Sequence, residues 1–196
     1  SPGVRFVILN HPRRPVSKLS ALEDIRFNPL SGEVHRGPAA LGVNAIEVLN
    51  GKSLSKDRME TFADWFGLLN HGDRTSAVAG GDSHSVNEIV GQARTYVASP
   101  TDDPSKADLP GICDSFVAGR LLVSLGLLAQ VRVDGKFNVG DLATGLGKSM
   151  NVELKVQGPS WTGADRVALY LNGVELRKEN VEPTKEPIKF QATWQV

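Results

Sequence analysis

The sequence predicts an α/β protein that continues into a small, antiparallel, β-rich module of sandwich-like character. Two observations carry this prediction. In the first part of the chain, short apolar runs alternate with helical segments, which favours parallel strands in an α/β sheet or barrel. After about residue 120, strand-like segments follow one another with Gly, Asn and Pro turns between them. We therefore expect two domains, residues 1–130 and residues 131–196.

Four segments of the first part are short, apolar and rich in branched residues, which is typical of buried strands. They cover residues 4–10, 45–51, 75–81 and 93–99. The first is expected to be buried on both faces and to end at the segment HPRRP, because Pro12 and Pro15 cannot continue a strand. The second closes with an Asn-Gly turn. Residues 27–40, rich in glycine and proline, are predicted to form a loop.

Two helices are predicted between strands. From Ser55 onwards, apolar residues recur at spacings of three and four, and His71-Gly72 ends this helix. A second helix carries Ile112 and Phe116 and is expected to end at a glycine, residue 119.

The second part carries a strong hairpin signal. In the segment YLNGVEL, Asn172 and Gly173 can both adopt the positive φ angles of a two-residue turn. Upstream, Trp161 lies in the turn-like segment GPSWTG, where two roles stay open. Its indole is expected to anchor the core of the module, and the alternative is that it stacks on the face of a sugar.

Charge and composition argue against several kinds of partner. The 196 residues include 22 Lys and Arg against 22 Asp and Glu. This balance argues against nucleic acid or an anionic membrane surface, because phosphate binding needs accumulated positive charge. No apolar run approaches the roughly 20 residues that cross a bilayer. The single cysteine, Cys113, cannot form an internal disulfide and is expected to be a small buried apolar residue.

Potential metal ligands lie in or directly after three of the predicted strands. His11 follows the first strand, and Glu47 lies within the second. Asp82 and His84 follow the third in the segment VAGGDSHS. Residues at the carboxyl ends of parallel strands meet at one edge of the sheet, where α/β proteins place their active sites. Because imidazole and carboxylate groups bind zinc, manganese and iron, these four residues are candidate ligands of a divalent metal.

Each candidate ligand also has a structural interpretation. The segment from Asp82 to His84 is compatible with a turn in which Asp or Ser caps a helix. His11 can end a strand with its imidazole hydrogen-bonded, and Glu47, inside an apolar strand, can be paired with an arginine. His71 follows a helix, where a protonated ring interacts favourably with the helix dipole.

Taken in order along the chain, several segments resemble one known family. These segments are FVILNHPRR, NAIEVLNG, DWFGLLNHGDR, AVAGGDSHS, ARTYVASP and AGRLLVSLGLL. They are similar to the second half of the PHP domain, named for polymerase and histidinol phosphatase, and in particular to the branch with carbaryl-hydrolase-like metallohydrolases. The resemblance covers roughly residues 4–135. The segments VDGKFNVGD and VQGPSWTGADRVALYLNGVEL, which follow, are similar to the β-rich tail of that branch.

The resemblance implies the C-terminal half of a distorted (βα)7 barrel whose strand ends hold two or three divalent metals, commonly zinc, manganese or iron. His11 matches the family's His-Pro motif, and Asp82 with His84 matches its last Asp-x-His motif, so all three are implied metal ligands. Glu47 matches a recurrent IEV-N pattern near the site. At position 81 the chain has Gly where the family often has Ser.

The family's first motifs, His-x-His and an Asp-His pair, have no counterpart in this sequence. We therefore expect the chain to be a fragment of a longer metal-dependent hydrolase and to be inactive alone. A half-barrel exposes unpaired strand edges and apolar surface, so a partner or a second copy is expected to cover them.

In the implied reaction, metal-bound water attacks a small-molecule substrate, which is a phosphoester or, in the nearer branch, an ester or carbamate. Arg13 and Arg74 follow a strand and a helix and are candidate catalytic residues that stabilise negative charge developing on the substrate. An alternative from another class is a non-catalytic scaffold with a degenerate metal site, whose β-rich module binds carbohydrate or protein.

Overall fold

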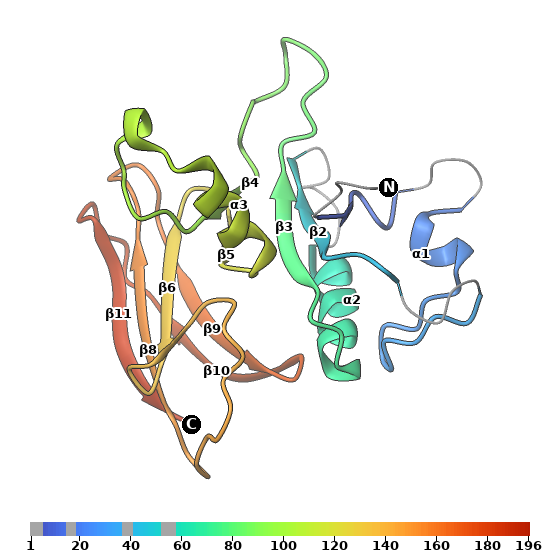
Figure 1. Ribbon diagram of the computed structural model, residues 1–196. Helices are drawn as coiled ribbons and strands as arrows, with labels where there is room; N and C mark the ends of the chain where they lie inside the picture. The colour runs from blue at the N-terminus through green and yellow to red at the C-terminus, as the bar shows by residue number, and fades with distance from the viewer. Residues whose placement is uncertain (1–5, 15–18, 37–40, 52–57) are drawn as a thin grey trace. The chain divides into compact units, whose positions relative to one another are not determined.

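The computed structural model of the protein describes residues 6–14, 19–36, 41–51 and 58–196. These residues form a mixed α/β structure in which strands outweigh helices, 34% against 17%, so that sheets carry most of the fold. The chain divides into two compact units, Ser1–Thr95 (unit 1) and Tyr96–Val196 (unit 2). Their elements are labelled in Figure 1. The domain boundary expected near residue 130 stays a prediction.

Unit 1 is built on a three-stranded parallel sheet with the strand order β1-β2-β3. Its strands are β1 (Ile8–Leu9), β2 (Ala45–Asn50) and β3 (Ser76–Gly80). All six residues of β2 are buried, as the apolar run predicts, because β2 is the central strand and helix α2 (Arg58–His71) packs against it. The described residues close no barrel.

The first strand differs from its prediction. Instead of a long strand buried on both faces, β1 holds only Ile8 and Leu9 and lies at the edge of the sheet. Val7 and Ile8 are 43% and 37% exposed. An apolar run does not distinguish an edge strand from a central one, because its burial depends on which elements cover it. Residues 4 and 5 of the predicted strand lie outside the described residues.

Helix α1 (Ala21–Asp24) attaches to the loop that follows β1. A capping box opens the helix: the Ser20 N–H donates to Glu23 Oε2 over 2.7 Å, and the Glu23 N–H donates to Ser20 Oγ over 3.4 Å. The Ser20 hydroxyl also donates to Glu23 Oε2 over 2.7 Å, and the two bonds that this carboxylate accepts, from the backbone and the hydroxyl of Ser20, hold the pKa of Glu23 below its ordinary value. The Leu22 N–H donates to the Pro12 carbonyl over 3.3 Å, which links α1 to that loop.

Helix α2 ends where the sequence predicts. Gly72 has a φ of 101°, and the Asp73 N–H donates back to the Leu68 carbonyl over 3.0 Å, the arrangement of a glycine-terminated helix. At this terminus His71 Nδ1 lies 3.1 Å from the carboxylate of Asp73. The helix start predicted at Ser55 lies outside the described residues.

Strand β4 (Arg94–Val97) does not continue the backbone ladder of the parallel sheet beyond β3. Instead, the hydroxyl of Thr95 accepts from the Ala79 N–H over 2.8 Å and donates to the Ala79 carbonyl over 2.9 Å. One side chain therefore satisfies both backbone groups of Ala79 at the outer edge of β3.

Unit 2 holds a four-stranded antiparallel sheet in the order β11-β8-β6-β7, a hairpin of β9 and β10, and the pairing of β4 with β5. Its elements are a 3-10 helix η2 (Pro104–Lys106), α3 (Leu109–Val117), β5 (Leu121–Ser124), β6 (Leu128–Val133), β7 (Phe137–Asn138), β8 (Asn151–Gln157), β9 (Arg166–Leu171), β10 (Val174–Asn180) and β11 (Ile188–Gln195). The antiparallel character predicted for this part is confirmed. Among the described residues, no helix is long and apolar enough to span a bilayer.

The core of unit 2 joins side chains from the four-stranded sheet and from the hairpin. Trp194, 1% exposed, packs with Val152 and Leu154, and Val167 and Leu169 of β9 pack against this group. Apolar side chains of two sheets therefore share one core, as in layered β proteins.

Two predictions for unit 2 are confirmed and two are wrong. Asn172 and Gly173 have φ angles of 53° and 83°, as the hairpin turn requires, and α3 ends before a glycine, residue 119, with φ of 75°. However, Trp161 is 85% exposed, so it does not anchor the core. Cys113 is also exposed, because α3 buries none of its residues completely.

We predict that Gly67→Ala destabilises helix α2. In most helix interiors this change stabilises by about 1 kcal/mol. Here a methyl group on residue 67 would overlap the Pro29 carbonyl oxygen, which lies against the helix. Amide hydrogen exchange within α2 should therefore become faster, whereas the change of the exposed Leu69 to alanine should leave it nearly unchanged. Slower exchange in the Gly67 variant would show that the loop around Pro29 yields without cost.

Candidate functional site

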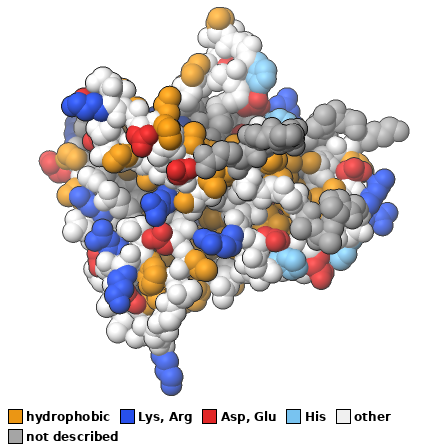
Figure 2. All heavy atoms as spheres, viewed as in Figure 1, with side chains coloured by type: hydrophobic (Ala, Val, Ile, Leu, Met, Phe, Trp, Pro, Cys, Tyr) orange, Lys and Arg blue, Asp and Glu red, His pale blue; other side chains and the backbone are white. Residues whose placement is uncertain are grey.

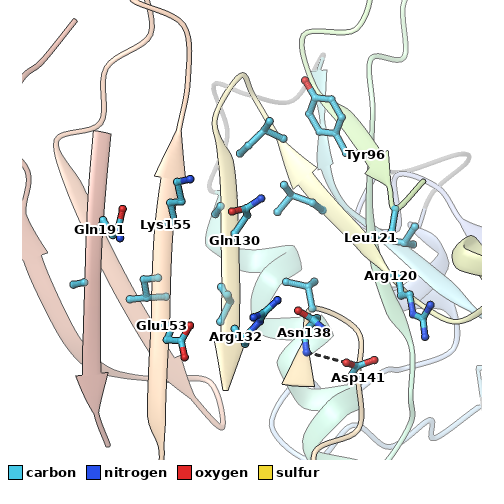
Figure 3. Close-up of a pocket in the computed structure, with 18 of the residues that line it drawn as sticks. Tyr96, Arg120, Leu121, Gln130, Arg132, Asn138, Asp141, Glu153, Lys155 and Gln191 are labelled. Atoms are coloured by element: carbon cyan, nitrogen blue, oxygen red, sulfur yellow. Dashed lines mark hydrogen bonds between the residues drawn. The ribbon is translucent and has the colours of Figure 1, made fainter. Parts of the chain in front are cut away.

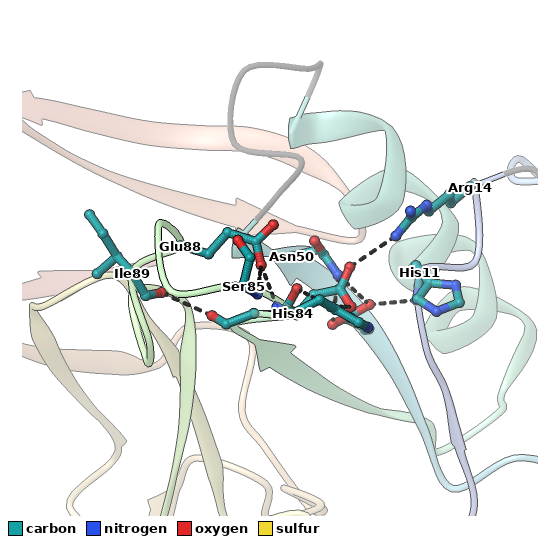
Figure 4. A network of polar contacts seen from close by, with 10 residues as sticks. His11, Arg14, Asn50, His84, Ser85, Glu88 and Ile89 are labelled. Atoms are coloured by element: carbon teal, nitrogen blue, oxygen red, sulfur yellow. Dashed lines mark hydrogen bonds and ion pairs between the residues drawn. The ribbon is translucent and has the colours of Figure 1, made fainter.

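A group of polar side chains gathers at one edge of the parallel sheet of unit 1 (Figure 4). Because β1, β2 and β3 are parallel, their carboxyl ends meet at this edge. Within the group, His11 and Asn50 donate to Glu47, while Arg14 and His84 contact Asp82. We call these six residues the edge cluster. The structure therefore brings together all four residues that the sequence nominates as metal ligands.

Two members of the edge cluster have unusual backbone conformations. His11 has a φ of 35° and Asp82 a φ of 51°, values in the left-handed region that residues other than glycine rarely adopt. Both residues lie just beyond the end of a strand, β1 and β3 respectively. Such conformations cost free energy, persist only where the surroundings enforce them, and concentrate at functional sites.

Glu47 is the buried member of the edge cluster, with 6% of its surface exposed. Its Oε2 accepts the backbone N–H of His11 over 2.5 Å, and the Asn50 amide donates to both carboxylate oxygens over 3.2 Å. Glycine at position 80 makes room, because a Cβ there would lie 2.9 Å from Glu47 Oε1. Within the described residues no arginine pairs with Glu47, so amide donors replace the ion pair that the structural interpretation expects.

Asp82 lies between a cation and an imidazole. Arg14 Nη1 is 3.0 Å from Asp82 Oδ2, and His84 Nδ1 is 3.4 Å from Asp82 Oδ1. The same ring nitrogen lies only 2.7 Å from the Asp82 backbone carbonyl. A carbonyl oxygen accepts and cannot donate, so His84 Nδ1 carries the proton. In the neutral ring the lone pair is then on Nε2, on a side chain that is 67% exposed.

The backbone at His84 and Ser85 forms hydrogen bonds with the Glu88 carboxylate and does not begin a helix. Glu88 Oε2 accepts the backbone N–H of His84 and, over 3.2 Å, that of Ser85. The Ser83 hydroxyl donates to the Ile89 carbonyl over 3.2 Å. Residues 83–92 form turns and bends without a helix, so the helix-cap interpretation of this segment is wrong.

Arg13 is directed away from the edge cluster, toward helix α2. Its Nε and Nη2 donate to the two carboxylate oxygens of Asp64 over 2.8 and 2.5 Å. The Asp64 side chain is completely buried and that of Arg13 is 21% exposed. The hydrogen bond to Asp64 raises the pKa of Arg13 above its ordinary value. The structure thus gives Arg13 a positioning role, because its side chain is committed to α2.

Arg74 lies far from the edge cluster within unit 1. It is exposed and precedes β3, whereas the edge cluster lies at the carboxyl ends of the strands. The amino and carboxyl ends of parallel strands lie on opposite sides of the sheet. The structure therefore does not bring Arg74 to the candidate site.

Sequence reasoning overlooked three residues that shape this region: Arg14, Asn50 and Asp64. Asn50 ends β2, so the rule that selected Asp82 also applied to it, but the Asn-Gly pair suggested only a turn. Asp64 lies four residues before the buried Leu68 on α2, and a carboxylate on an apolar helix face was a signal of pairing. Arg14 had no signal that distinguished it from Arg13.

The edge cluster contains the types of side chain that bind a divalent metal, but too few of them are arranged together to form a metal site. Imidazole and carboxylate are suitable donors for zinc, manganese and iron. Among the described residues, however, no three or more His, Cys, Asp or Glu side chains are arranged as a metal site. Arg14 and Asn50 donate to carboxylate oxygens that a metal would otherwise approach.

Comparisons with protein-family models, with curated proteins and with solved structures found no match to this chain. The resemblance to the PHP domain therefore stays a prediction that rests on the sequence segments alone.

We predict that Arg13→Ala and Arg14→Ala differ sharply in stability. Removal of Arg13 leaves the Asp64 carboxylate buried without its cation, which should lower the free energy of unfolding of unit 1 by about 3 kcal/mol. Arg14 is about half exposed, so the loss of its pair with Asp82 should cost less than about 1 kcal/mol. Hydrogen exchange of the α2 amides measures both effects. Equal losses in the two variants would contradict the positioning role of Arg13.

Proposed function

We propose that unit 1 carries part of the metal centre of a PHP-type metal-dependent hydrolase. The observation that supports this proposal best is the orientation of His84. Its Nδ1–H donates to the Asp82 carbonyl over 2.7 Å, which directs the lone pair to Nε2. Histidines that bind metals are held in this way, with one ring nitrogen donating to a carbonyl or carboxylate and the other facing the metal.

In this proposal the residues of the edge cluster have different roles. His84 binds through Nε2, and Asp82, whose side chain is 13% exposed, binds through its carboxylate. The resemblance implies His11 as a third ligand, although its imidazole forms no three-residue metal site with Asp82 and His84 among the described residues. Glu47 is a positioning residue, because its oxygens already accept from the His11 N–H and the Asn50 amide and so fix the loop that carries His11.

A divalent metal held by these residues would supply a water molecule of lowered pKa as the nucleophile. Other residues of this chain hold the candidate ligands in position. Glu88 holds the His84 backbone, and Arg14 neutralises Asp82 until a metal competes for the carboxylate. Arg14 replaces Arg13 and Arg74 as the cation at the site, because it alone of the three contacts a candidate ligand.

The surface beside His84 favours an uncharged substrate. Val86, Ile89 and Val90 follow His84 on the same loop and are 100%, 69% and 84% exposed. Figure 2 shows apolar side chains at the tip of this loop. Exposed apolar groups of this kind accommodate an apolar acyl or aryl group better than a phosphate. This supports an ester or carbamate substrate over a phosphoester.

The proposal includes the finer fold. The sheet β1-β2-β3 with α2 is proposed as part of the distorted (βα)7 barrel, and the exposed edge at β1 as the place where a further strand or a second copy pairs.

Metal binding tests the proposal. Nuclear magnetic resonance of the chain during titration with Mn²⁺ should show selective broadening of the amide signals of Gly81 and Ser83, which flank Asp82, even when binding is weak. The double variant Asp82→Ala/His84→Ala should lose this broadening, because two ligands are removed. Zinc content after dialysis, measured by mass spectrometry, provides an independent readout.

A matched control exists elsewhere on unit 1. His71 and Asp73 are also an imidazole and a carboxylate two residues apart, 3.1 Å from each other. The double variant His71→Ala/Asp73→Ala should retain the broadening at Gly81 and Ser83. Broadening that persists without Asp82 and His84, or that never occurs, would remove the edge cluster from metal binding.

We also predict that Arg14→Ala strengthens metal binding. Arg14 and a metal compete for the Asp82 carboxylate, whose Oδ2 lies 3.0 Å from Arg14 Nη1. An exposed ion pair of this kind contributes up to about 1 kcal/mol, so its loss should improve the affinity for Mn²⁺ by about fivefold. Calorimetric titration measures the change. Weaker binding in the variant would mean that Arg14 supports the site instead of competing for it.

A further inference from the structure

A hollow of about 880 Å³ opens over one face of the four-stranded sheet of unit 2 (Figure 3). Its floor is the face opposite the apolar core, and its walls include residues of β4, β5 and the segment around β7. Six polar side chains from β6, β8 and β11 lie on the floor. We call them the polar trough: Gln130, Arg132, Glu153, Lys155, Gln191 and Thr193.

The register of the strands arranges these six side chains in two rows. Gln130 and Gln191 lie opposite Lys155, one on each neighbouring strand. The second row holds Arg132, Glu153 and Thr193. Neighbours within a row are about 4.8 Å apart across the strands, and the rows are about 6.8 Å apart along them. The result is a grid of regularly spaced hydrogen-bonding groups.

The six side chains of the polar trough do not form hydrogen bonds with one another. Among the described residues, no side-chain hydrogen bond or ion pair is found for any of the six, although Arg132 and Glu153 lie directly opposite each other. Amide groups both donate and accept, Arg and Lys only donate, and the carboxylate only accepts. A ligand that meets all six must therefore present acceptors to Arg132 and Lys155 and a donor to Glu153 within a short distance.

The charge of the hollow limits the class of ligand. Arg120, Arg132 and Lys155 face Glu153 and Asp141, and the Asp141 carboxylate already accepts from the Asn138 N–H over 2.8 Å. This small positive excess is too weak for a nucleic-acid backbone. Charged residues at the centre are also unlike the core of a protein interface, which is depleted of Lys and Glu.

We propose that the polar trough binds an acidic oligosaccharide, a chain of sugars that carry carboxylate groups. Sugar hydroxyls donate and accept, as the amides of Gln130 and Gln191 and the carboxylate of Glu153 require. A sugar carboxylate meets Lys155 or Arg132 in a charge-assisted hydrogen bond. Tyr96, which is 39% exposed, lines the wall and offers an aromatic face to a sugar ring. The inference lies within unit 2 and is independent of the metal centre proposed for unit 1.

Three probes distinguish recognition of sugar hydroxyls from recognition of carboxylates. Calorimetric titration of the full chain with an oligogalacturonate tests hydroxyls and carboxylates together. A malto-oligosaccharide of equal length presents hydroxyls alone, and an oligoglutamate presents carboxylates alone. We expect saturable binding of the oligogalacturonate and affinities at least tenfold weaker for the other two. Absence of oligogalacturonate binding, or equal binding of either other probe, would overturn the proposal.

Two glutamines of β11 provide a matched pair of variants. Gln191 and Gln195 lie four residues apart, hence on the same face of the strand, but only Gln191 lines the hollow. Gln191→Ala should weaken oligogalacturonate binding about fivefold, and Lys155→Ala about tenfold, whereas Gln195→Ala should leave it unchanged. An equal effect of the two glutamine variants would place the ligand elsewhere.

Discussion

Burial of the Asp64 carboxylate is the constraint on which the arrangement of unit 1 depends. A carboxylate that is shielded from solvent requires a cationic or hydrogen-bonding partner, and Asp64 accepts two hydrogen bonds from the guanidinium of Arg13. Arg13 lies in the loop after β1, a strand of only two residues that holds little by itself. The pairing therefore fixes that loop against α2. His11 and Arg14, on either side of Arg13 in sequence, take their positions in the edge cluster as a result.

The two carboxylates of the edge cluster have different kinds of partner. Asp82 is shared between the Arg14 guanidinium and the His84 ring, while the buried Glu47 accepts from N–H donors and pairs with no cation among the described residues. Left-handed backbone at His11 and Asp82 adds a conformational cost. A region organised only for stability would have little need for these features together. They are consistent with a site whose hydrogen bonds are exchanged when a ligand enters.

Local sequence patterns predicted the features that local forces decide. The buried run of β2, the glycine that ends α2 and the turn at Asn172-Gly173 all follow from short segments. Features that depend on distant neighbours were missed: the short exposed β1 and the choice of Trp194 over Trp161 for the core. For the candidate site, the rule of parallel strand ends selected His11, Asp82 and His84, whereas Glu47 lies inside β2 and was selected as a carboxylate within an apolar strand. It could not select Arg14 over Arg13, because only the path of the loop decides which arginine meets Asp82.

The hydroxyl of Thr95 makes the two edges of the parallel sheet unequal as places where a further strand can pair. At Ala79 both backbone groups of the β3 edge are already bound by one side chain, so an incoming strand would have to displace it before forming its own ladder. At the opposite edge lies β1, where only Ile8 and Leu9 pair and where Val7 and Ile8 are partly exposed to solvent. Any enlargement of the sheet, by more chain or by another molecule, is thereby directed to one side.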